Sequence, residues 1–266
     1  ALGMTGADVV QSKLGYTGEG IKIGIIDSGI DYDHVEFGGS GTPGPEPAEG
    51  DGSTNFPDSK VVAGHDFVGN AFGDPAADAT TRLTPAPDDY PDDCWGHGTH
   101  VAGTLAGTRY GVAKDALITP VRVLSCSGVG SDSQVIAGIN WVIKNHAAGA
   151  PAVANLSLGT GSAVNDAVRA LIADGVTTVI AAGNRSTNAC TRSPAQVTEA
   201  LTVAAVDRTD TEAAFSNYGP CVDLYAPGVG IVSADWRTTS GTLVYRGTSM
   251  ATPHVAGTIA LLKYID

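Results

Sequence analysis

The sequence has few basic residues and no long hydrophobic run. Only 15 Lys and Arg stand against 28 Asp and Glu among 266 residues, which gives a formal net charge of −13. Nucleic acids and anionic membranes carry the same sign of charge, so this balance argues against both as partners. No apolar run approaches the roughly 20 residues that span a bilayer, and Ala1 does not open a charged-then-apolar segment typical of a secretion signal.

Cysteine is scarce, and its count is even. The four residues are Cys94, Cys126, Cys190 and Cys221. An even count in a chain with few lysines fits two disulfides and a secreted, extracellular protein, because disulfides persist in oxidising compartments. Sequential pairing would close two loops of about 32 residues, each contributing about 3–4 kcal/mol on the chain-entropy model. Two other pairings satisfy the same count.

Acidic residues and proline concentrate in an excursion over about residues 38–93. Between Asp31 and Asp93 there are 14 acidic residues against two basic ones, together with eight of the 14 prolines. This composition favours a solvated, irregular surface segment. A second interpretation is that some of the carboxylates bind calcium, a hard cation that prefers several oxygen ligands. No twelve-residue EF-hand spacing is present, so the sequence leaves both interpretations open.

Short aliphatic segments alternate with helical patterns along the chain. Near-continuous apolar character predicts buried strands over 21–26, 61–67, 117–124, 153–158, 176–182 and 201–206. Apolar residues at helical spacing predict helices over 131–147, over 164–173 and from near Ser249 onward. We therefore expect one α/β domain over 1–266, with three layers and a mostly parallel sheet flanked by helices. In such sheets, ligands bind beyond the carboxyl ends of the strands.

Four polar residues lie where such a sheet would hold a ligand. Asp27 ends the first predicted strand, and His97 lies at a glycine-lined turn before a helix of small residues. Ser249 begins the last helix, whose free N–H groups suit a developing oxyanion, and Asn184 follows another strand and offers an amide donor. Each residue taken singly more often serves as a cap, a turn or a structural histidine. Their combination indicates nucleophilic catalysis.

Two other hydrolytic chemistries compete with this interpretation. Cys94, His97 and His100 have metal-like spacing, which makes a zinc-dependent hydrolase an alternative, although no second ligand pair follows them. A carboxylesterase of another α/β type is disfavoured, because Ser249 does not lie within a Gly-x-Ser-x-Gly turn.

Three long motifs resemble those of the subtilisin-like serine proteases, in the family's order Asp, His, Ser. They are Ile26-Asp27-Ser28-Gly29, Gly96-His97-Gly98-Thr99-His100 and Gly247-Thr248-Ser249-Met250-Ala251-Thr252-Pro253. The arrangement of the four cysteines and the segment Phe215-Ser216-Asn217-Tyr218-Gly219 are most similar to the proteinase K branch. The resemblance covers about residues 20–262.

The resemblance implies a secreted serine endopeptidase that forms an acyl-enzyme on Ser249. His97 would act as general base and then as general acid, and Asp27 would orient its imidazole. Asn184 and the Ser249 backbone N–H would form the oxyanion hole. A non-catalytic member of the same fold is the alternative, and the presence of all four residues argues against it.

The resemblance also implies where a substrate lies. An extended peptide would bind as a strand between two segments, and small residues would wall the pocket for the side chain before the cleaved bond. These residues are Leu124, Gly128, Val129, Gly130, Ser157, Leu158, Gly159, Ala182 and Gly183. Arg192, near the rim of this pocket, would favour acidic groups in the substrate. The implied partners are protein or peptide substrates, the protein's own pro-segment and proteinaceous inhibitors, and the enzyme would be a monomer.

A structural calcium ion is the one cofactor that the resemblance implies. In the proteinase K branch the aspartate that matches Asp223 binds calcium together with two main-chain carbonyls, which fall at Thr198 and Ala200 in this sequence. Carboxylate and carbonyl oxygens are suitable ligands for this hard cation. The alternative is that Asp223 caps a turn. No organic cofactor is expected.

Overall fold

The computed structural model describes residues 1–42, 56–73, 77–78, 80 and 83–265, so part of the predicted acidic excursion lies outside the described residues. The strands of the described residues are β1 Lys22–Asp27, β2 His65–Asp66, β3 Leu117–Arg122, β4 Ala152–Leu156, β5 Thr177–Ala181, β6 Leu201–Val206, β7 Leu224–Pro227, β8 Ile231–Ala234 and β9 Thr242–Tyr245. The α-helices are α1 Leu2–Thr5, α2 Ala7–Val9, α3 His97–Ala106, α4 Asp132–Asn145, α5 Asn165–Ala173 and α6 Thr248–Ile265. Short helical turns lie at η1 Val10–Leu14, η2 Val35–Phe37, η4 Ser162–Val164 and η5 Ala189–Thr191.

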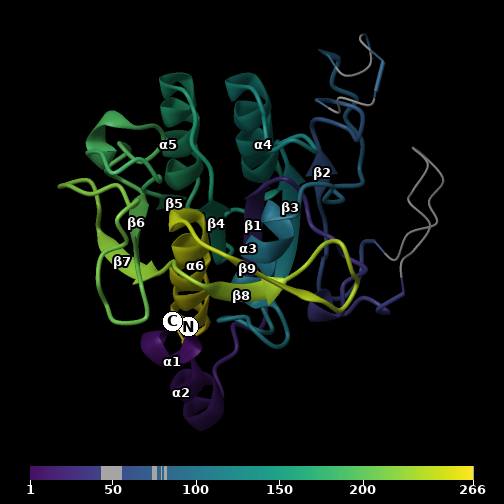
Figure 1. The fold of residues 1–266 in the computed structure, drawn as a ribbon. Helices are drawn as coiled ribbons and strands as arrows, with labels where there is room; N and C mark the ends of the chain where they lie inside the picture. Colours follow the sequence, from purple (N-terminus) through teal and green to yellow (C-terminus); the bar gives the residue numbers. More distant parts are fainter. Residues whose placement is uncertain (43–55, 74–76, 79, 81–82, 266) are drawn as a thin grey trace.

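A parallel sheet forms the centre of the molecule (Figure 1). Within the described residues it has seven strands in the order β2-β3-β1-β4-β5-β6-β7, and each neighbouring pair is parallel. The strands β8 and β9 form a separate antiparallel pair. The predicted mostly parallel sheet is therefore confirmed.

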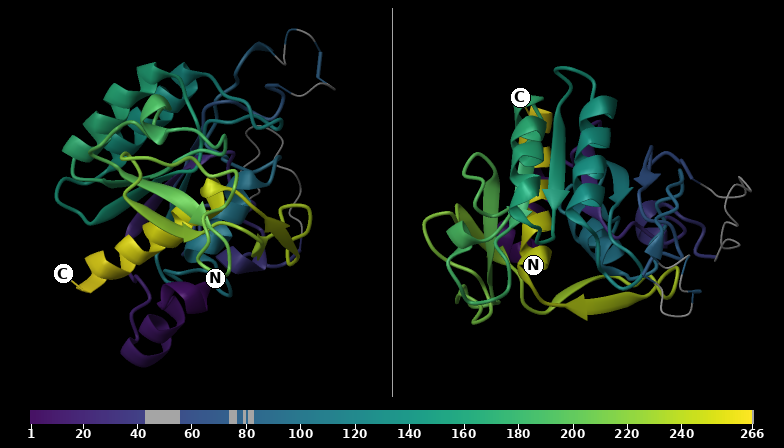
Figure 2. Two further views of the ribbon diagram at one scale, coloured as in Figure 1. Left: turned by 60° about the vertical axis from the view of Figure 1, so that its left-hand side comes forward. Right: turned by 90° about the horizontal axis from the view of Figure 1, so that it is seen from above.

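Helices cover both faces of this sheet. The helices α4 and α5 lie side by side over one face, and α3 and α6 pack together on the other (Figure 1, Figure 2). Side chains of β1 alternate between the two layers: Ile23 and Ile25 belong to the core that contains α3 and α6, and Ile26 to the core that contains α4 and α5. This arrangement confirms the predicted three-layer α/β fold.

The helices α4 and α5 begin and end within two residues of the predicted bounds. The side chain of Ser131 accepts the N–H of Gln134, and the Gln134 side chain accepts the N–H of Ser131, so a capping box starts α4. Gly175, at φ 97°, follows the end of α5. The longest described helix is α6, and no helix of the described residues is long and apolar enough to cross a membrane.

The strand predicted over 61–67 is interrupted. Val61 forms a single bridge with Ile118, and regular pairing resumes only at His65 opposite Val121. From Val61 to His65 this strand advances by four residues, while β3 advances by three, from Ile118 to Val121. One extra residue is therefore inserted in this strand. The interruption lies beside Pro120 of β3, which has no N–H to donate.

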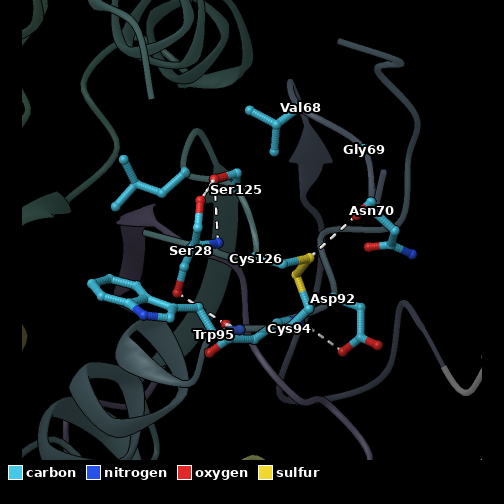
Figure 3. Close-up of a disulfide and its surroundings, with 12 residues drawn as sticks. Ser28, Val68, Gly69, Asn70, Asp92, Cys94, Trp95, Ser125 and Cys126 are labelled. Atoms are coloured by element: carbon cyan, nitrogen blue, oxygen red, sulfur yellow. Dashed lines mark hydrogen bonds between the residues drawn. A yellow bond between two sulfur atoms is a disulfide. The ribbon is translucent and has the colours of Figure 1, made fainter. Parts of the chain in front are cut away.

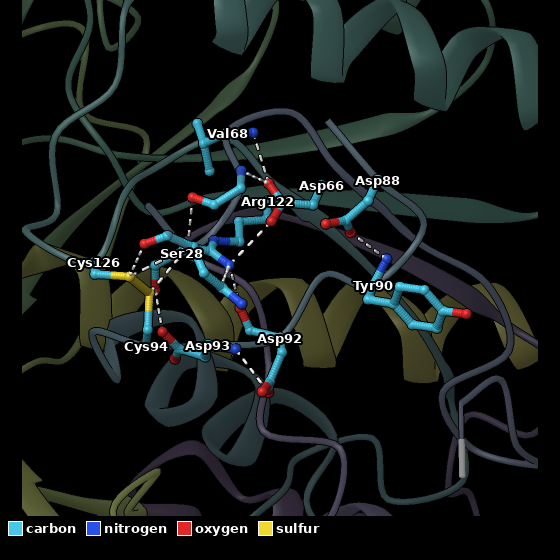
Figure 4. Close-up of polar contacts among 12 residues, drawn as sticks. Ser28, Asp66, Val68, Asp88, Tyr90, Asp92, Asp93, Cys94, Arg122 and Cys126 are labelled. Carbon is cyan, nitrogen blue, oxygen red and sulfur yellow. Dashed lines mark hydrogen bonds and ion pairs between the residues drawn. A yellow bond between two sulfur atoms is a disulfide. The ribbon is translucent and has the colours of Figure 1, made fainter. Parts of the chain in front are cut away.

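A buried ion pair ties the described part of the excursion to the sheet (Figure 4). Arg122 is fully buried at the end of β3, and its Nη1 lies 3.0 Å from Oδ2 of Asp66. The same nitrogen donates to Oδ1 of Asn70 at 2.6 Å and to the carbonyl of Asp92 at 3.0 Å. Burial raises the pKa of Asp66 to about 6, although the charge of Arg122 and two backbone N–H groups oppose the shift. The expectation of a solvated excursion is therefore wrong for Asp66.

Both disulfides follow sequential pairing. Cys94 is bonded to Cys126 and Cys190 to Cys221, so all four cysteines are used. The first bond joins the loop before α3 to the segment after β3 (Figure 3). The Nη2 of Arg122 lies 2.9 Å from Sγ of Cys94, so this disulfide and the buried ion pair brace the same region.

Candidate active site

His97 is the first residue of α3, and its imidazole contacts the carboxylate that ends β1. Its Nδ1 lies 2.7 Å from Oδ1 of Asp27. Asp27 is fully buried, and the same oxygen accepts the Ser28 N–H at 2.8 Å. The structure thus brings together two predicted site residues that are 70 positions apart in the chain.

The charge of Asp27 changes the titration of His97. Burial opposes protonation of the imidazole, but the charge and hydrogen bond of Asp27 and the charge of Asp93 outweigh it, so the pKa of His97 is raised above 6.5. Burial lowers the pKa of His100 and of His254 to about 4. Of these three histidines, His97 alone contacts a carboxylate.

Two glycines allow α3 to start against the end of β1. A Cβ atom on Gly98 would lie closer than 3.0 Å to the carbonyl oxygen of Gly29. A Cβ atom on Gly96 would lie equally close to the indole of Trp236, and Gly96 has a φ of 94° that favours glycine. The close approach that places His97 beside Asp27 therefore depends on these residues having no side chain.

Asp93 joins the two segments that carry Asp27 and His97, and Figure 4 shows it beside Ser28. Its Oδ1 accepts the hydroxyl of Ser28 at 3.0 Å and the N–H of Gly96 at 2.8 Å. Its Oδ2 accepts the N–H and the hydroxyl of Thr99 at 2.9 Å and 2.6 Å. Burial raises the pKa of Asp93, and the hydrogen bonds oppose the shift. We did not identify Asp93 from the sequence, because its role depends on these tertiary contacts.

Ser249 is the second residue of α6, in the first turn, where backbone N–H groups lack an intrahelical partner. Its Oγ donates to the carbonyl of Ser157 at 2.9 Å, and the hydroxyl of Ser157 donates to the carbonyl of Ser249 at 3.0 Å. These paired bonds fix the start of α6 against the end of β4. In the described structure, no hydrogen bond joins Ser249 to His97.

The amide of Asn184 is oriented by the residue before Ser249. Its Oδ1 accepts the N–H and the hydroxyl of Thr248 at 2.8 Å and 3.0 Å. The Thr248 hydroxyl oxygen in turn accepts the N–H of Gly183 at 3.0 Å. Because Oδ1 is held by two donors, Nδ2 is the group that Asn184 can offer to a ligand.

One cleft of about 1180 Å³ joins these groups, and His97, Asn184 and Ser249 all line it. The residues predicted to bind substrate line the same cleft: Leu124, Gly128, Val129, Gly130, Ser157, Leu158, Gly159, Ala182 and Gly183. The buried Asp27 lies behind His97. The structure therefore brings the predicted catalytic and substrate-binding residues to one surface.

Residues 18–264 match the model of the subtilase family, Peptidase_S8. The chain belongs to the subtilase family. It is 44% identical over 247 residues to an extracellular serine proteinase of Thermus sp. (strain Rt41A). The aligned region covers 92% of this chain and 51% of that protein. It is 45% identical over 248 residues to alkaline serine exoprotease A of Vibrio alginolyticus, and this alignment covers 92% of this chain and 39% of that protein. This subtilase chain thus spans about half the length, or less, of these curated relatives.

A solved structure is also similar. A cold-adapted subtilisin-like serine proteinase aligns with a TM-score of 0.74 and 38% sequence identity, over 94% of this chain and 78% of that one. The fold and the family agree with the resemblance that the three motifs indicate.

The zinc alternative is wrong for this subtilase. The sulfur of Cys94 is bonded to Cys126, so it offers no thiolate to a metal. The Nε2 of His100 is already engaged in a hydrogen bond with the carbonyl of Ile231, at 3.0 Å.

The residues predicted to bind calcium lie just before the starts of two paired strands. Val203 of β6 is opposite Leu224 of β7, which places the preceding Asp223 opposite Thr202. The Oδ2 of Asp223 accepts the Thr202 N–H at 2.8 Å, and Thr198 and Ala200 precede β6 directly. One carboxylate and two carbonyl oxygens, the ligands that the resemblance implies, suit a hard cation in their chemistry.

Among the described residues, those around Asp223 included, no group of three or more His, Cys, Asp or Glu could hold a metal ion. For the described part of the acidic excursion, this finding gives no support to the calcium interpretation.

Trp95 is a cleft residue that sequence reasoning missed. Its ring stacks on that of His97, with centroids 5.1 Å apart and planes 22° apart, and it lines the cleft. A Cβ atom on Gly128 would lie closer than 3.0 Å to the indole. The only sequence signal was its position two residues before His97.

Proposed function

We propose that this chain is the catalytic domain of a secreted serine endopeptidase of the subtilase family. The observation that carries the proposal is the single cleft that His97, Asn184 and Ser249 all line, with His97 held at 2.7 Å by Asp27. The two disulfides and the relative named an extracellular serine proteinase support secretion.

In the proposed reaction, Oγ of Ser249 attacks the carbonyl carbon of the substrate and Nε2 of His97 takes its proton. Rotation about the Cα–Cβ bond of Ser249 would turn Oγ from the carbonyl of Ser157 toward His97, and catalytic hydrogen bonds often form only with substrate bound. The protonated His97 then gives its proton to the leaving amine, and water hydrolyses the acyl-enzyme. Asp27 holds the imidazole and stabilises its charged form.

The substrate would lie as an extended strand between the segments 124–130 and 157–159. The glycines of these segments let the peptide backbone approach closely. A pro-segment or a proteinaceous inhibitor would occupy the same cleft, and the enzyme would act as a monomer.

Replacing Asn184 with leucine should lower kcat by about 100- to 1000-fold with little change in KM. The reason is that Nδ2 would stabilise the oxyanion of the transition state rather than the bound substrate. Hydrolysis of an internally quenched peptide measures both constants, and Asn145→Leu on the exposed side of α4 is the control. An equal loss in substrate binding would contradict the assigned role.

The pH dependence of activity should follow His97. The general base acts when neutral, and its pKa is raised above 6.5, so kcat/KM should fall as the pH drops through a midpoint above 6.5. Asp27→Asn removes the charge that raises this pKa and should move the remaining acid limb to lower pH. An acid limb that lies below 6.5 in the unmodified protein, or stays in place in the variant, would argue against this assignment.

We also propose that Asp223 binds calcium with the carbonyl oxygens of Thr198 and Ala200. An ion that binds only the folded state stabilises it by about 2.7 kcal/mol at a hundredfold excess over its Kd. EGTA should therefore lower Tm by roughly 5–10 °C. Asp223→Asn should reproduce most of this loss, whereas Asp8→Asn on α2 should not. A melting curve that neither calcium nor EGTA changes would refute the site.

A further inference from the structure

The cleft carries positive charge although the protein is strongly acidic. Three arginines line it: Arg185, Arg192 and Arg246. All three are exposed, and among the described lining residues the one carboxylate is that of Asp132. The whole chain has a net charge of −13, so this local excess of cationic groups runs against the composition of the molecule.

These arginines have no carboxylate partner in the described structure. The ion pairs there involve other cations, and none of the three lies within 4.0 Å of an acidic oxygen. Arg192 makes one long contact, from Nε to the hydroxyl of Thr187 at 3.4 Å. Asp132 is already engaged at the start of α4, because its Oδ1 accepts the Gly161 N–H at 2.8 Å. Their charges are therefore available to a ligand.

Two of the arginines border the proposed pocket for the substrate side chain before the cleaved bond. Arg185 directly follows Asn184 on the wall that begins with Ala181. Arg192 precedes Ser193, whose carbonyl accepts the N–H of Thr160 at 2.9 Å and so adjoins the wall 157–159.

The walls themselves are small and apolar. Ala181, Ala182 and Leu158 are buried and supply no charge. Such walls can contact the methylene groups of a glutamate while its carboxylate stays at the rim. A guanidinium group there matches a carboxylate in shape and can form paired hydrogen bonds with it.

We propose that this cleft selects peptides with an acidic side chain at the residue that precedes the cleaved bond. Arg185 and Arg192 receive the carboxylate, and Arg246, three residues before Ser249, adds to the positive potential. The inference rests on the proposed peptidase function and gives its substrate class.

Matched peptides test the selection. Internally quenched peptides that differ only in Glu, Gln, Lys or Leu before the cleaved bond are compared by kcat/KM. At low ionic strength the Glu peptide should be cleaved about 5-fold faster than the Gln peptide, and the ratio should fall in 0.5 M NaCl as salt screens the charges. Equal or faster cleavage of the Gln peptide would overturn the inference.

Arginine variants assign the effect to the cleft. The triple variant Arg185→Gln, Arg192→Gln, Arg246→Gln should bring the Glu-to-Gln ratio to about 1. Arg208→Gln, on an exposed turn that does not line the cleft, should keep the ratio of the unmodified protein. A triple variant with an unchanged ratio also overturns the assignment. If no peptide of the series is cleaved, the proposed peptidase function itself fails.

Discussion

Replacing Ser249 with alanine is expected to lower kcat by on the order of 10⁶-fold, because Oγ is the proposed nucleophile and no neighbouring group can replace it. The only described side-chain hydrogen bond lost is that from Oγ to the carbonyl of Ser157. The fold should therefore remain, since this contact is one polar bond at the edge of the cleft.

The comparison needs a matched serine and a measure of folding. Ser12→Ala removes an exposed hydroxyl that bonds only the carbonyl of Asp8, and it should keep full activity. Thermal melting of both variants shows whether they fold. A Ser249→Ala variant that is folded and retains more than about one-tenth of the turnover is incompatible with the proposed nucleophile.

Replacing Arg122 with leucine is expected to destabilise the protein by about 3–5 kcal/mol, because Asp66 would remain buried without its cation. The loss also includes the hydrogen bonds of Arg122 to Asn70 and to the carbonyl of Asp92. Denaturant unfolding measures the change. Arg169→Leu, which breaks the exposed pairs of Arg169 with Asp166 and Glu199, should cost less than about 1 kcal/mol.

The loss caused by Arg122→Leu should depend on pH in a defined direction. In the folded protein the pKa of Asp66 is about 6, above its ordinary 3.8. Ionisation of this buried carboxylate therefore lowers the free energy of unfolding as the pH rises from 3.8 through about 6. Removing Arg122 raises this pKa further. The variant should therefore lose more stability at pH 8 than at pH 5, where Asp66 is largely protonated and needs no cation. The double variant with Asp66→Leu should recover part of the loss and show no such pH dependence.

The central sheet could be predicted from the sequence because its strands are continuous apolar segments. The strand predicted over 201–206 coincides with β6. The strands β8 and β9 gave no such signal, because they are only four residues long and Val232 and Val244 are exposed. The interruption before β2 could not be predicted from the sequence either, because it depends on which residues of β3 pair with this strand.

Asp27, His97 and Ser249 could be predicted because they lie in long motifs that resemble those of a known family, and Asn184 because it follows a predicted strand. The residues that position them could not. Asp93 and Thr248 act through hydrogen bonds to distant segments: Asp93 bonds to Ser28, 65 positions away, and Thr248 to Asn184, 64 positions away. The pairing of Arg122 with Asp66 likewise exists only once β2 and β3 lie side by side.

Covalent labelling with a fluorophosphonate tests the central claim most directly. Such a reagent modifies a serine only where a neighbouring base activates it and donors stabilise the charge that develops. The account predicts one adduct per folded chain, mapped by peptide mass spectrometry to Ser249 and absent after unfolding. No adduct on the folded protein, or an adduct at another residue with Ser249 unmodified, would contradict the account and favour a non-catalytic member of the fold.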